Sequence, residues 1–452
     1  MKILSLWPPQ VPSYFNAGHH LPVFLTAAYL RGQGHEVKAI DAGALNMDWK
    51  RFADTAYQGR YDLVAIVNDF DNTDDFDRTV RYIRRLSPQT SIVTAGRLSV
   101  EAPAVFESTD VDGIVTSGDP ESGVASFASW LGRGSDIGEI PPGLTVRHDC
   151  RWLRSARPGT LLPAAEWCLP DTSEIPYAAY GRMYQRDESK FCGIPDRREL
   201  VVPAARGCPI GCSYCDVPGV QGVKDRRLTV ERTVAYIKES FDREPFEYVA
   251  FYAPTFTLNR RWTRELCTAL RAEGSPYPWK CATAISHLPL DLLEDMAAAR
   301  CVRVSVGLET LEPDGQGNLP PQKHISFGRF QELADACTRL GVELNCFVIA
   351  GLPGTTPLGV ERTVAEIRSV GGRTRPTMYA NIEELRRATT LEDAALYNRH
   401  LLHPFDADEQ DLHELVFGEE KHITEVMQSV PQRTWPTGHP LRPRKPPTAQ
   451  PN

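Results

Sequence analysis

Hydrophobic residues in the first 135 positions fall into short runs separated by segments of helical spacing. The runs are KILSLW from Lys2, YDLVAIV from Tyr61, TSIVTAG from Thr90 and VDGIVTS from Val111. Between the first two runs, LPVFLTAAYLRGQG has helical spacing and HEVKAID reads as a further strand. This alternation of buried strands and helices predicts a doubly wound, Rossmann-like α/β domain for residues 1–135.

A second alternating series follows a less regular segment. Residues 136–195 are rich in Pro, Gly and Arg and lack sustained periodicity, so we expect a linker there. Residues 196–385 contain six βα units, which predict a partial (β/α)6 TIM-like barrel with its active site at the C-terminal strand ends. We expect residues 386–452 to form a small C-terminal helical cap and a Pro-rich tail. The predicted barrel strands begin at Glu199, Tyr248, Trp279, Val302 and Glu343, with a weaker strand near Thr377–Ala380.

Composition and net charge limit the classes of molecule that the protein is expected to bind. The chain is 42% hydrophobic and 24% charged, as in ordinary folded proteins. Its net charge of −8 argues against a nucleic-acid or anionic-membrane partner. No hydrophobic run approaches the roughly 20 residues that span a bilayer, and Pro8 interrupts any signal-peptide core. We therefore expect a cytoplasmic enzyme without nucleic-acid or membrane partners.

Three of the eleven cysteines, Cys208, Cys212 and Cys215, crowd together directly after a predicted strand. The other eight are scattered singly and are expected to be small core residues. A zinc site normally needs a second pair of ligands, and a two-cysteine redox motif leaves the third cysteine idle. Three thiolates on a tight loop suit a [4Fe–4S] cluster with one open iron. That open iron can chelate S-adenosyl-L-methionine (SAM).

The loop RGCPIGCSYC has further features of such a site. Gly207 and Gly211 allow the backbone to fold around a cluster, and Tyr214 is an aromatic residue directly before the third cysteine. With this loop after its first strand, residues 196–385 resemble a radical SAM core. The resemblance implies reductive cleavage of SAM to methionine and a 5′-deoxyadenosyl radical, which abstracts a hydrogen atom from the substrate.

Motifs later in the barrel extend the resemblance. FTLN (Phe256–Asn259) is similar to a turn of the superfamily branch that carries a cobalamin-binding domain. VSVGLET (Val304–Thr310) and VIAGLPGTT (Val348–Thr356) are similar to the ends of its fourth and fifth strands, which face SAM. The residues that the resemblance places at SAM are Tyr214, Ser305, Glu309, Lys323, Asn345, Gly351 and Pro353.

The N-terminal domain resembles the cobalamin-binding module of the same branch through KILSLWPP, LTAAYLRGQGHEVKAID and IVTSGDPE. Two turns that would contact the corrin depart from the pattern. In TAGRLSV, Arg97 and Leu98 add bulk where close backbone approach is needed, and in SGDPES, Pro120 removes an N–H donor. The motif of a lower axial histidine is also absent. Cobalamin binding is therefore left open.

Other polar residues receive weaker expectations. The second barrel strand ends in Ala253 and Pro254 and the third in Ala284, where relatives commonly carry charges, which suggests a reshaped substrate pocket. The candidate polar groups at the barrel mouth are Thr255, His287, Asn345 and Tyr379, whereas His19, His20 and His35 are expected to be surface or loop histidines.

Two reactions and one non-catalytic role fit these features. We favour a radical dehydratase, a lyase of antibiotic biosynthesis, acting on a sugar-like diol. Because its two corrin-contact turns depart from the cobalamin-binding pattern, the chain resembles the aminoglycoside C3′-deoxygenating diol dehydratases of apramycin biosynthesis. That chemistry needs an unidentified acid and an external electron donor or partner reductase. The alternative is a cobalamin-dependent radical SAM C-methyltransferase of natural-product biosynthesis. A non-catalytic iron–sulfur or zinc-binding scaffold is the third possibility.

Overall fold

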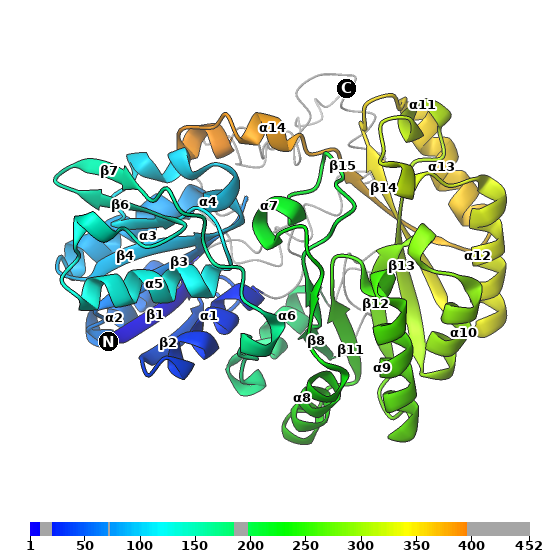
Figure 1. Cartoon of the computed structure of the whole chain (residues 1–452), viewed down its shortest axis with the longest axis horizontal. Helices are drawn as coiled ribbons and strands as arrows, with labels where there is room; N and C mark the ends of the chain where they lie inside the picture. The colour runs from blue at the N-terminus through cyan, green and yellow to red at the C-terminus, as the bar shows by residue number, and fades with distance from the viewer. Residues whose placement is uncertain (10–19, 71–72, 185–197, 396–452) are drawn as a thin grey trace, which may run out of the picture.

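The computed structural model describes residues 1–9, 20–70, 73–184 and 198–395. Figure 1 shows an N-terminal α/β domain beside a partial barrel, with the chain returning to the first domain after the last barrel strand. Both predicted architectures are confirmed. No helix in the described part of the chain is long and apolar enough to cross a bilayer.

The N-terminal domain is built on a seven-stranded sheet in the order β2-β1-β3-β4-β5-β6-β7. The first five strands are parallel, and β6 and β7 extend the sheet as an antiparallel hairpin. This hairpin lies in the segment expected to be a linker. The strands are β1 (Lys2–Trp7), β2 (Glu36–Asp41), β3 (Leu63–Asn68), β4 (Ser91–Gly96), β5 (Gly113–Val115), β6 (Leu144–His148) and β7 (Arg151–Arg154).

Helices cover both faces of this sheet, which explains why β3 is buried along its whole length. On one face α1 (Leu21–Gly32) packs against α5 (Pro120–Gly132), and on the other α2 (Trp49–Gly59) packs against α3 (Thr73–Leu86). The short helix α4 (Arg97–Glu101) follows β4 without a connecting loop. Arg97 therefore lies at the C-terminal edge of the sheet.

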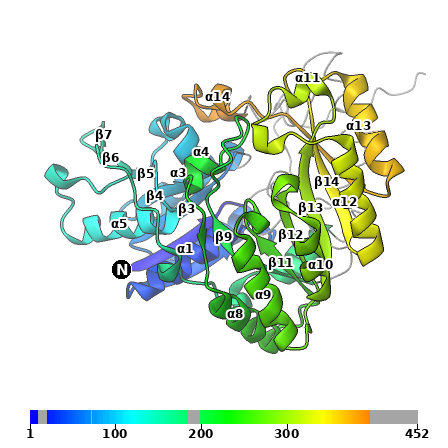
Figure 2. The same cartoon turned by 45° about the vertical axis from the view of Figure 1, so that its right-hand side comes forward.

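The barrel has six parallel strands in the order β8-β11-β12-β13-β14-β15. The sixth strand begins at Arg373, earlier than expected, because its polar sequence RTRPTM is half-buried at every position and carries no hydrophobic alternation. The strands are β8 (Glu199–Pro203), β11 (Tyr248–Tyr252), β12 (Trp279–Ala284), β13 (Cys301–Glu309), β14 (Glu343–Ala350) and β15 (Arg373–Met378). The outer helices are α8 (Val230–Arg243), α9 (Arg260–Ala272), α10 (Leu290–Ala298), α12 (Phe327–Leu340) and α13 (Pro357–Ser369), as Figure 2 shows.

The two domains share a hydrophobic core. Trp7 and Phe24 of the first domain belong to the same buried cluster as Val201, Tyr248 and Ala250 of the barrel. Leu200 and Val249, one residue along each strand, belong instead to the core shared with the outer helices. Because strand side chains alternate between faces, the N-terminal domain packs against the inner face of β8 and β11.

After β15 the chain crosses back to the N-terminal domain. Figure 1 shows the short helix α14 (Ile382–Leu385) beside the N-terminal domain. Ile382 and Leu385 are buried in the cluster that contains Phe52 and Phe76 of α2 and α3. This return ties the last barrel strand to the first domain. The rest of the expected cap and tail, residues 396–452, lies outside the described residues.

Candidate active site

The cysteine loop leaves the barrel at the C-terminal end of β8. Short strands β9 (Ala205–Arg206) and β10 (Arg226–Arg227) pair in antiparallel fashion and close its base. Gly207 has a φ of +85°, and a Cβ there would lie 2.2 Å from the Lys224 carbonyl oxygen, so only glycine fits. The Cys208 N–H donates to the Gly222 carbonyl over 3.1 Å. The backbone thus fixes the position of the first cysteine.

The three cysteines lie close to one another in a largely buried setting. Cys208 and Cys212 pack with Ile210 and Ala284. Burial raises the pKa of the Cys212 thiol, and it raises the pKa of Cys215 to about 12. Such thiols lose their protons when a metal binds. Ala284, at a position where relatives commonly carry a charge, thus packs beside two of the cysteines.

The donor set fits an iron–sulfur cluster better than a single ion. Within the described residues, no three His, Cys, Asp or Glu side chains converge to hold one metal ion. In a cubane cluster each thiolate binds a different iron, so the three sulfurs need not meet at one point. Thiolate ligands favour soft metals and clusters over Mg²⁺ or Ca²⁺. Cys208, Cys212 and Cys215 can therefore hold a [4Fe–4S] cluster and leave one iron open.

An ion pair lies beside this loop at the end of β13. Lys323 Nζ is 2.8 Å from Glu309 Oε1, and both side chains are largely buried. Burial alone would lower the pKa of Lys323, but the Glu309 carboxylate and the nearby cysteines raise it above its usual value. Burial and the proximity of Glu309 and Cys212 raise the pKa of Tyr214. Tyr214, Glu309 and Lys323, from three segments of the chain, thus surround one spot next to the cysteines.

The remaining predicted SAM residues lie on β13, β14 and the turn after β14. Ser305 and Asn345 are paired in register, and Asn345 Nδ2 donates to Ser305 Oγ over 3.1 Å. Gly351 directly follows β14 with a φ of +77°, and the Pro353 carbonyl accepts from Asn318 Nδ2 over 2.9 Å. These residues are therefore adjacent on the barrel, whereas their contact with SAM stays a prediction.

The other predicted polar groups lie around the same loop. The Thr255 hydroxyl is 3.6 Å from Cys208 Sγ, and Tyr379 packs on the cluster of Leu319, Ile349 and Leu352 that also contacts Tyr214. Burial, with Arg260 and Lys323 nearby, lowers the pKa of His287.

A cavity that the sequence did not predict lies between the two domains. It has a volume of about 370 Å³ and is lined by both domains. Its wall includes Trp7, His20, Asp69 and Arg97 from the first domain and Tyr252, Lys280, Ser305 and Phe347 from the barrel. Ser305 connects this cavity to the predicted SAM residues. The cavity is therefore the candidate substrate site, because it lies next to the residues predicted to bind SAM.

Arg97 crosses from the N-terminal domain to the cysteine loop. Its Nε donates to Asp216 Oδ2 over 2.6 Å, and its Nη1 donates to Asp69 Oδ1 over 3.1 Å. Asp216 directly follows Cys215 in the sequence. The guanidinium also stacks over Phe70, with 4.2 Å to the ring centroid. The first turn expected to contact a corrin is thus occupied by an ion-pair bridge.

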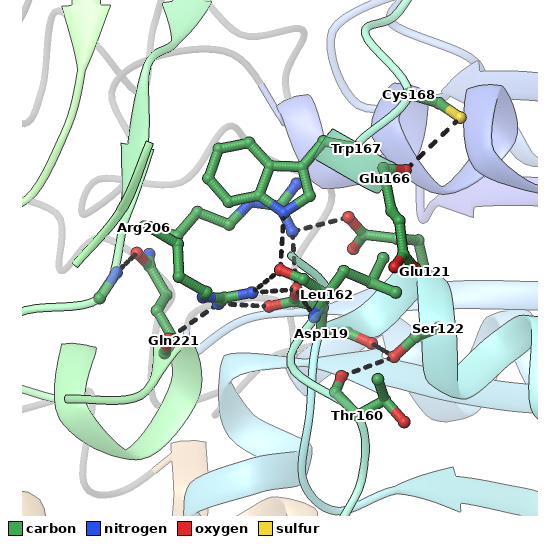
Figure 3. A network of polar contacts seen from close by, with 12 residues as sticks. Asp119, Glu121, Ser122, Thr160, Leu162, Glu166, Trp167, Cys168, Arg206 and Gln221 are labelled. Carbon is green, nitrogen blue, oxygen red and sulfur yellow. Dashed lines mark hydrogen bonds and ion pairs between the residues drawn. The ribbon is translucent and has the colours of Figure 1, made fainter. Parts of the chain in front are cut away.

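The second turn is occupied as well. Figure 3 shows Asp119 and Glu121, at the start of α5, bound to Arg206 at the base of the cysteine loop. Arg226, from the same base, pairs with Asp119 over 2.6 Å. All four side chains are at least nine-tenths buried. The Arg206 guanidinium lies 4.5 Å from the Trp167 ring centroid, and Asp119 accepts from the Leu162 N–H over 2.8 Å. This second turn therefore fastens the cysteine loop to the N-terminal domain.

The residues of these two turns can be compared with what a bound cobalamin would need at this edge of the sheet. A corrin laid on this edge needs small residues and free N–H donors, but Arg97 crosses it and Pro120 begins α5. The Asp119 and Glu121 carboxylates are engaged by arginines. The described residues at this edge therefore do not fit a corrin.

Known proteins are similar to this chain in sequence and in fold. Residues 202–367 match the model of the radical SAM superfamily. An uncharacterised methyltransferase of Pyrococcus horikoshii is 23% identical over 374 residues, covering 80% of this chain and 77% of that protein.

Two solved structures share the two-domain fold. The radical SAM methyltransferase TsrM of Kitasatospora setae, with cobalamin and a [4Fe–4S] cluster bound, superposes with a TM-score of 0.67 at 18% identity, covering 83% of this chain and 72% of that one. The cobalamin-dependent radical enzyme OxsB, with aqua-cobalamin and SAM bound, gives 0.63 at 13% identity and covers 91% and 56%. Residues 202–367 thus match the radical SAM superfamily, and the chain shares with these structures a fold in which such a barrel follows an N-terminal Rossmann-like domain.

Proposed function

We propose that Cys208, Cys212 and Cys215 hold a [4Fe–4S] cluster and that Glu309, Lys323 and the strand residues Ser305 and Asn345 bind SAM beside it. When bound, the cluster supplies the electron that cleaves SAM to methionine and a 5′-deoxyadenosyl radical. The all-sulfur donor set and the left-handed Gly207 support this assignment. The Glu309–Lys323 pair presents fixed, opposite charges next to the loop, which suits a ligand that carries both an amino and a carboxylate group.

We place a small polar substrate in the interdomain cavity. Its volume of about 370 Å³ lies near the lower end of the range, roughly 300–1,000 Å³, of pockets for drug-sized ligands. The wall combines aromatic rings such as Trp7 and Phe347 with polar groups such as Lys280 and Ser305. Aromatic faces and hydrogen-bonding groups together suit a sugar-like molecule. Enclosure between two domains also protects a carbon radical from side reactions.

The reaction that we favour is dehydration of a vicinal diol without cobalamin. The observation that carries it is Arg97, whose side chain bridges Asp69 and Asp216 across the corrin-facing edge. Removal of a hydrogen atom beside one hydroxyl allows the neighbouring hydroxyl to leave as water. The resulting radical must then gain one electron and one proton, so an external one-electron donor or partner reductase is part of the proposal. We propose an aminoglycoside intermediate as the substrate class, because in its altered corrin-contact turns the sequence resembles the aminoglycoside diol dehydratases.

Methyl transfer is the second candidate, and the named relatives support it better than they support dehydration. The Pyrococcus horikoshii relative and TsrM are both named methyltransferases, and TsrM and OxsB were solved with cobalamin bound. On this alternative the chain binds cobalamin between its domains and forms S-adenosylhomocysteine.

One experiment separates the two candidates. The protein is reconstituted anaerobically with iron, sulfide and hydroxocobalamin, desalted, and incubated with SAM, a reductant and a panel of aminoglycosides. We expect 5′-deoxyadenosine, no retained cobalamin and no S-adenosylhomocysteine. Stoichiometric cobalamin together with a methylated product would establish the methyltransferase instead.

The cysteine assignment has its own test. Single alanine variants of Cys208, Cys212 and Cys215 should each lose the cluster's absorbance and all 5′-deoxyadenosine formation. The control is Cys267→Ala in α9, a buried cysteine of the hydrophobic core that should retain the cluster. Loss of cluster from the control, or its retention in all three loop variants, contradicts the assignment.

A further inference from the structure

Two stacked aromatic rings from the N-terminal domain form part of the cavity wall. Trp7 ends β1 and His20 directly precedes α1. Their ring centroids are 3.5 Å apart and their planes differ by 10°. His20 was expected to be a surface or loop histidine; it does lie in the loop before α1, but it is not on the surface, because only 2% of it is exposed. It is held in the core of the domain interface.

A buried carboxylate orients the His20 ring. His20 Nδ1 is 2.6 Å from Asp41 Oδ2, and the Tyr180 hydroxyl donates to the same oxygen. Burial alone would raise the pKa of Asp41, but His20 and hydrogen bonds from the Ala44 N–H and Tyr180 lower it below its usual value. The Asp41 carboxylate thus fixes the orientation of the His20 ring through Nδ1 and leaves Nε2 on the opposite side.

The opposite side of each ring is unsatisfied. Neither His20 Nε2 nor Trp7 Nε1 has a hydrogen-bond partner among the residues that the structure describes, although both atoms are buried. An unsatisfied buried polar group is destabilising, because it has lost its hydrogen bonds to water without gaining others. Two such atoms in residues that line one cavity point to a polar ligand there.

The other charged groups of this wall already have partners. Lys280 pairs with Glu199 over 2.6 Å, and Arg97 pairs with Asp69. Asp119 and Glu121 are bound by Arg226 and Arg206. Arg206 Nη2 also lacks a hydrogen-bond partner among the described residues, but a guanidinium does not release its proton. His20 Nε2 differs from it because an imidazole nitrogen can both give and take a proton.

We propose that His20, supported by Asp41, is the proton-transfer residue of the dehydration and that Trp7 Nε1 donates a hydrogen bond to a substrate hydroxyl. The inference rests on the proposed function. After hydrogen abstraction, protonated His20 gives its Nε2 proton to the neighbouring hydroxyl, whose C–O bond breaks as water leaves. His20 then takes the proton of the hydroxyl on the radical carbon, which becomes a carbonyl. The unpaired electron moves to the adjacent carbon, where the one-electron donor and a proton complete the product.

The test uses the reconstituted full-length chain and counts dehydrated product per 5′-deoxyadenosine. The probes are aminoglycosides with neighbouring ring hydroxyls, with neamine as the first, in deuterated and unlabelled form. His20→Gln should still move deuterium into 5′-deoxyadenosine but should lower the product ratio about 100-fold or more, the usual contribution of acid–base catalysis. Asp41→Asn should lower the ratio by a smaller factor. The matched control is His35→Gln, a histidine of the same domain that does not line the cavity and should keep the wild-type ratio.

Each outcome decides between the proposal and its failure. A wild-type product ratio in His20→Gln overturns the role of His20. A methylated product, or no dehydrated product from the wild-type chain on this panel, overturns the proposed function and the inference with it. Iron content and melting temperature identify a variant that misfolds. If His20→Gln misfolds, Trp7→Phe preserves the stacked ring without its N–H and should raise KM for the substrate at least tenfold, whereas an unchanged KM contradicts the inferred contact.

Discussion

At the scale of single residues, the predicted SAM site depends on one glycine beside the charged pair. A Cβ at Gly307 would lie 2.3 Å from Lys323 Nζ and 2.5 Å from Glu309 Oε1, which is closer than any real contact. Glu309 itself has a φ of +64°, an uncommon conformation for a non-glycine residue. The end of β13 is thus shaped around the position of one carboxylate. Such local strain is often found at functional sites.

Gly307→Ala should therefore weaken SAM binding more than it weakens the fold. The added methyl group displaces the ends of two side chains rather than backbone, so we expect roughly tenfold weaker SAM binding, about 1.4 kcal/mol. Gly328→Ala in α12 is the control, because a Cβ there meets nothing within 4 Å. SAM affinity and melting temperature are measured for both reconstituted variants. Equal SAM affinity in the two would contradict a role for the Glu309–Lys323 pair in binding.

At the scale of elements, charged residues hold the N-terminal ends of the last three barrel strands together. Glu343 at the start of β14 binds Arg303 of β13 over 2.9 Å and Arg373 of β15 over 2.7 Å. Burial alone would raise the pKa of Glu343, but the two arginines lower it below its usual value. Its ionised form is therefore favoured in the folded chain.

The lowered pKa of Glu343 makes its two ion pairs sensitive to acid. The stabilisation by Glu343 is complete above the pKa of the unfolded chain, about 4.3, and is lost as the pH falls through the lower folded value. We expect the wild-type protein to be more stable than Glu343→Gln near pH 7, with the difference shrinking below about pH 4.3. Urea unfolding of cluster-free protein across this range measures it. A stability difference between the two proteins that grew as the pH fell would contradict the lowered pKa of Glu343.

At the scale of the whole molecule, the N-terminal domain is fastened to the cysteine loop by buried ion pairs. Arg206 and Arg226 flank the loop, and both bind Asp119 of the first domain. Removing one partner of a buried pair costs about 3–5 kcal/mol, because the other charge is left buried. The two domains therefore support the loop together.

Asp119→Asn should destabilise the chain by about 3 kcal/mol and release the loop. The control is Glu174→Gln, since the Arg31–Glu174 pair is about one-third exposed and such pairs contribute below about 1 kcal/mol. Unfolding in urea gives the stability, and loss of cluster absorbance in air gives the exposure of the loop. A cluster as durable in Asp119→Asn as in the control would mean that the first domain does not protect the loop.

The sequence alone was sufficient for features that are local in the chain. Hydrophobic periodicity predicted both domains, and the spacing of Cys208, Cys212 and Cys215 pointed to the radical SAM barrel. It was insufficient where distant segments meet. His20 becomes a buried, carboxylate-bound ring only because Trp7, Asp41 and Tyr180 converge on it in the folded chain. The hairpin of β6 and β7 was missed because only part of it is buried.

The proposed dehydration is tested most directly by measuring hydrogen transfer from the substrate to 5′-deoxyadenosine. The reconstituted chain is incubated with SAM, a reductant and an aminoglycoside deuterated at its ring carbons, and the nucleoside and sugar products are analysed by mass spectrometry. We predict deuterium in 5′-deoxyadenosine and a sugar product that has lost one water. Methylated sugar together with S-adenosylhomocysteine would contradict the proposed dehydration, and 5′-deoxyadenosine without deuterium would contradict hydrogen abstraction from this substrate class.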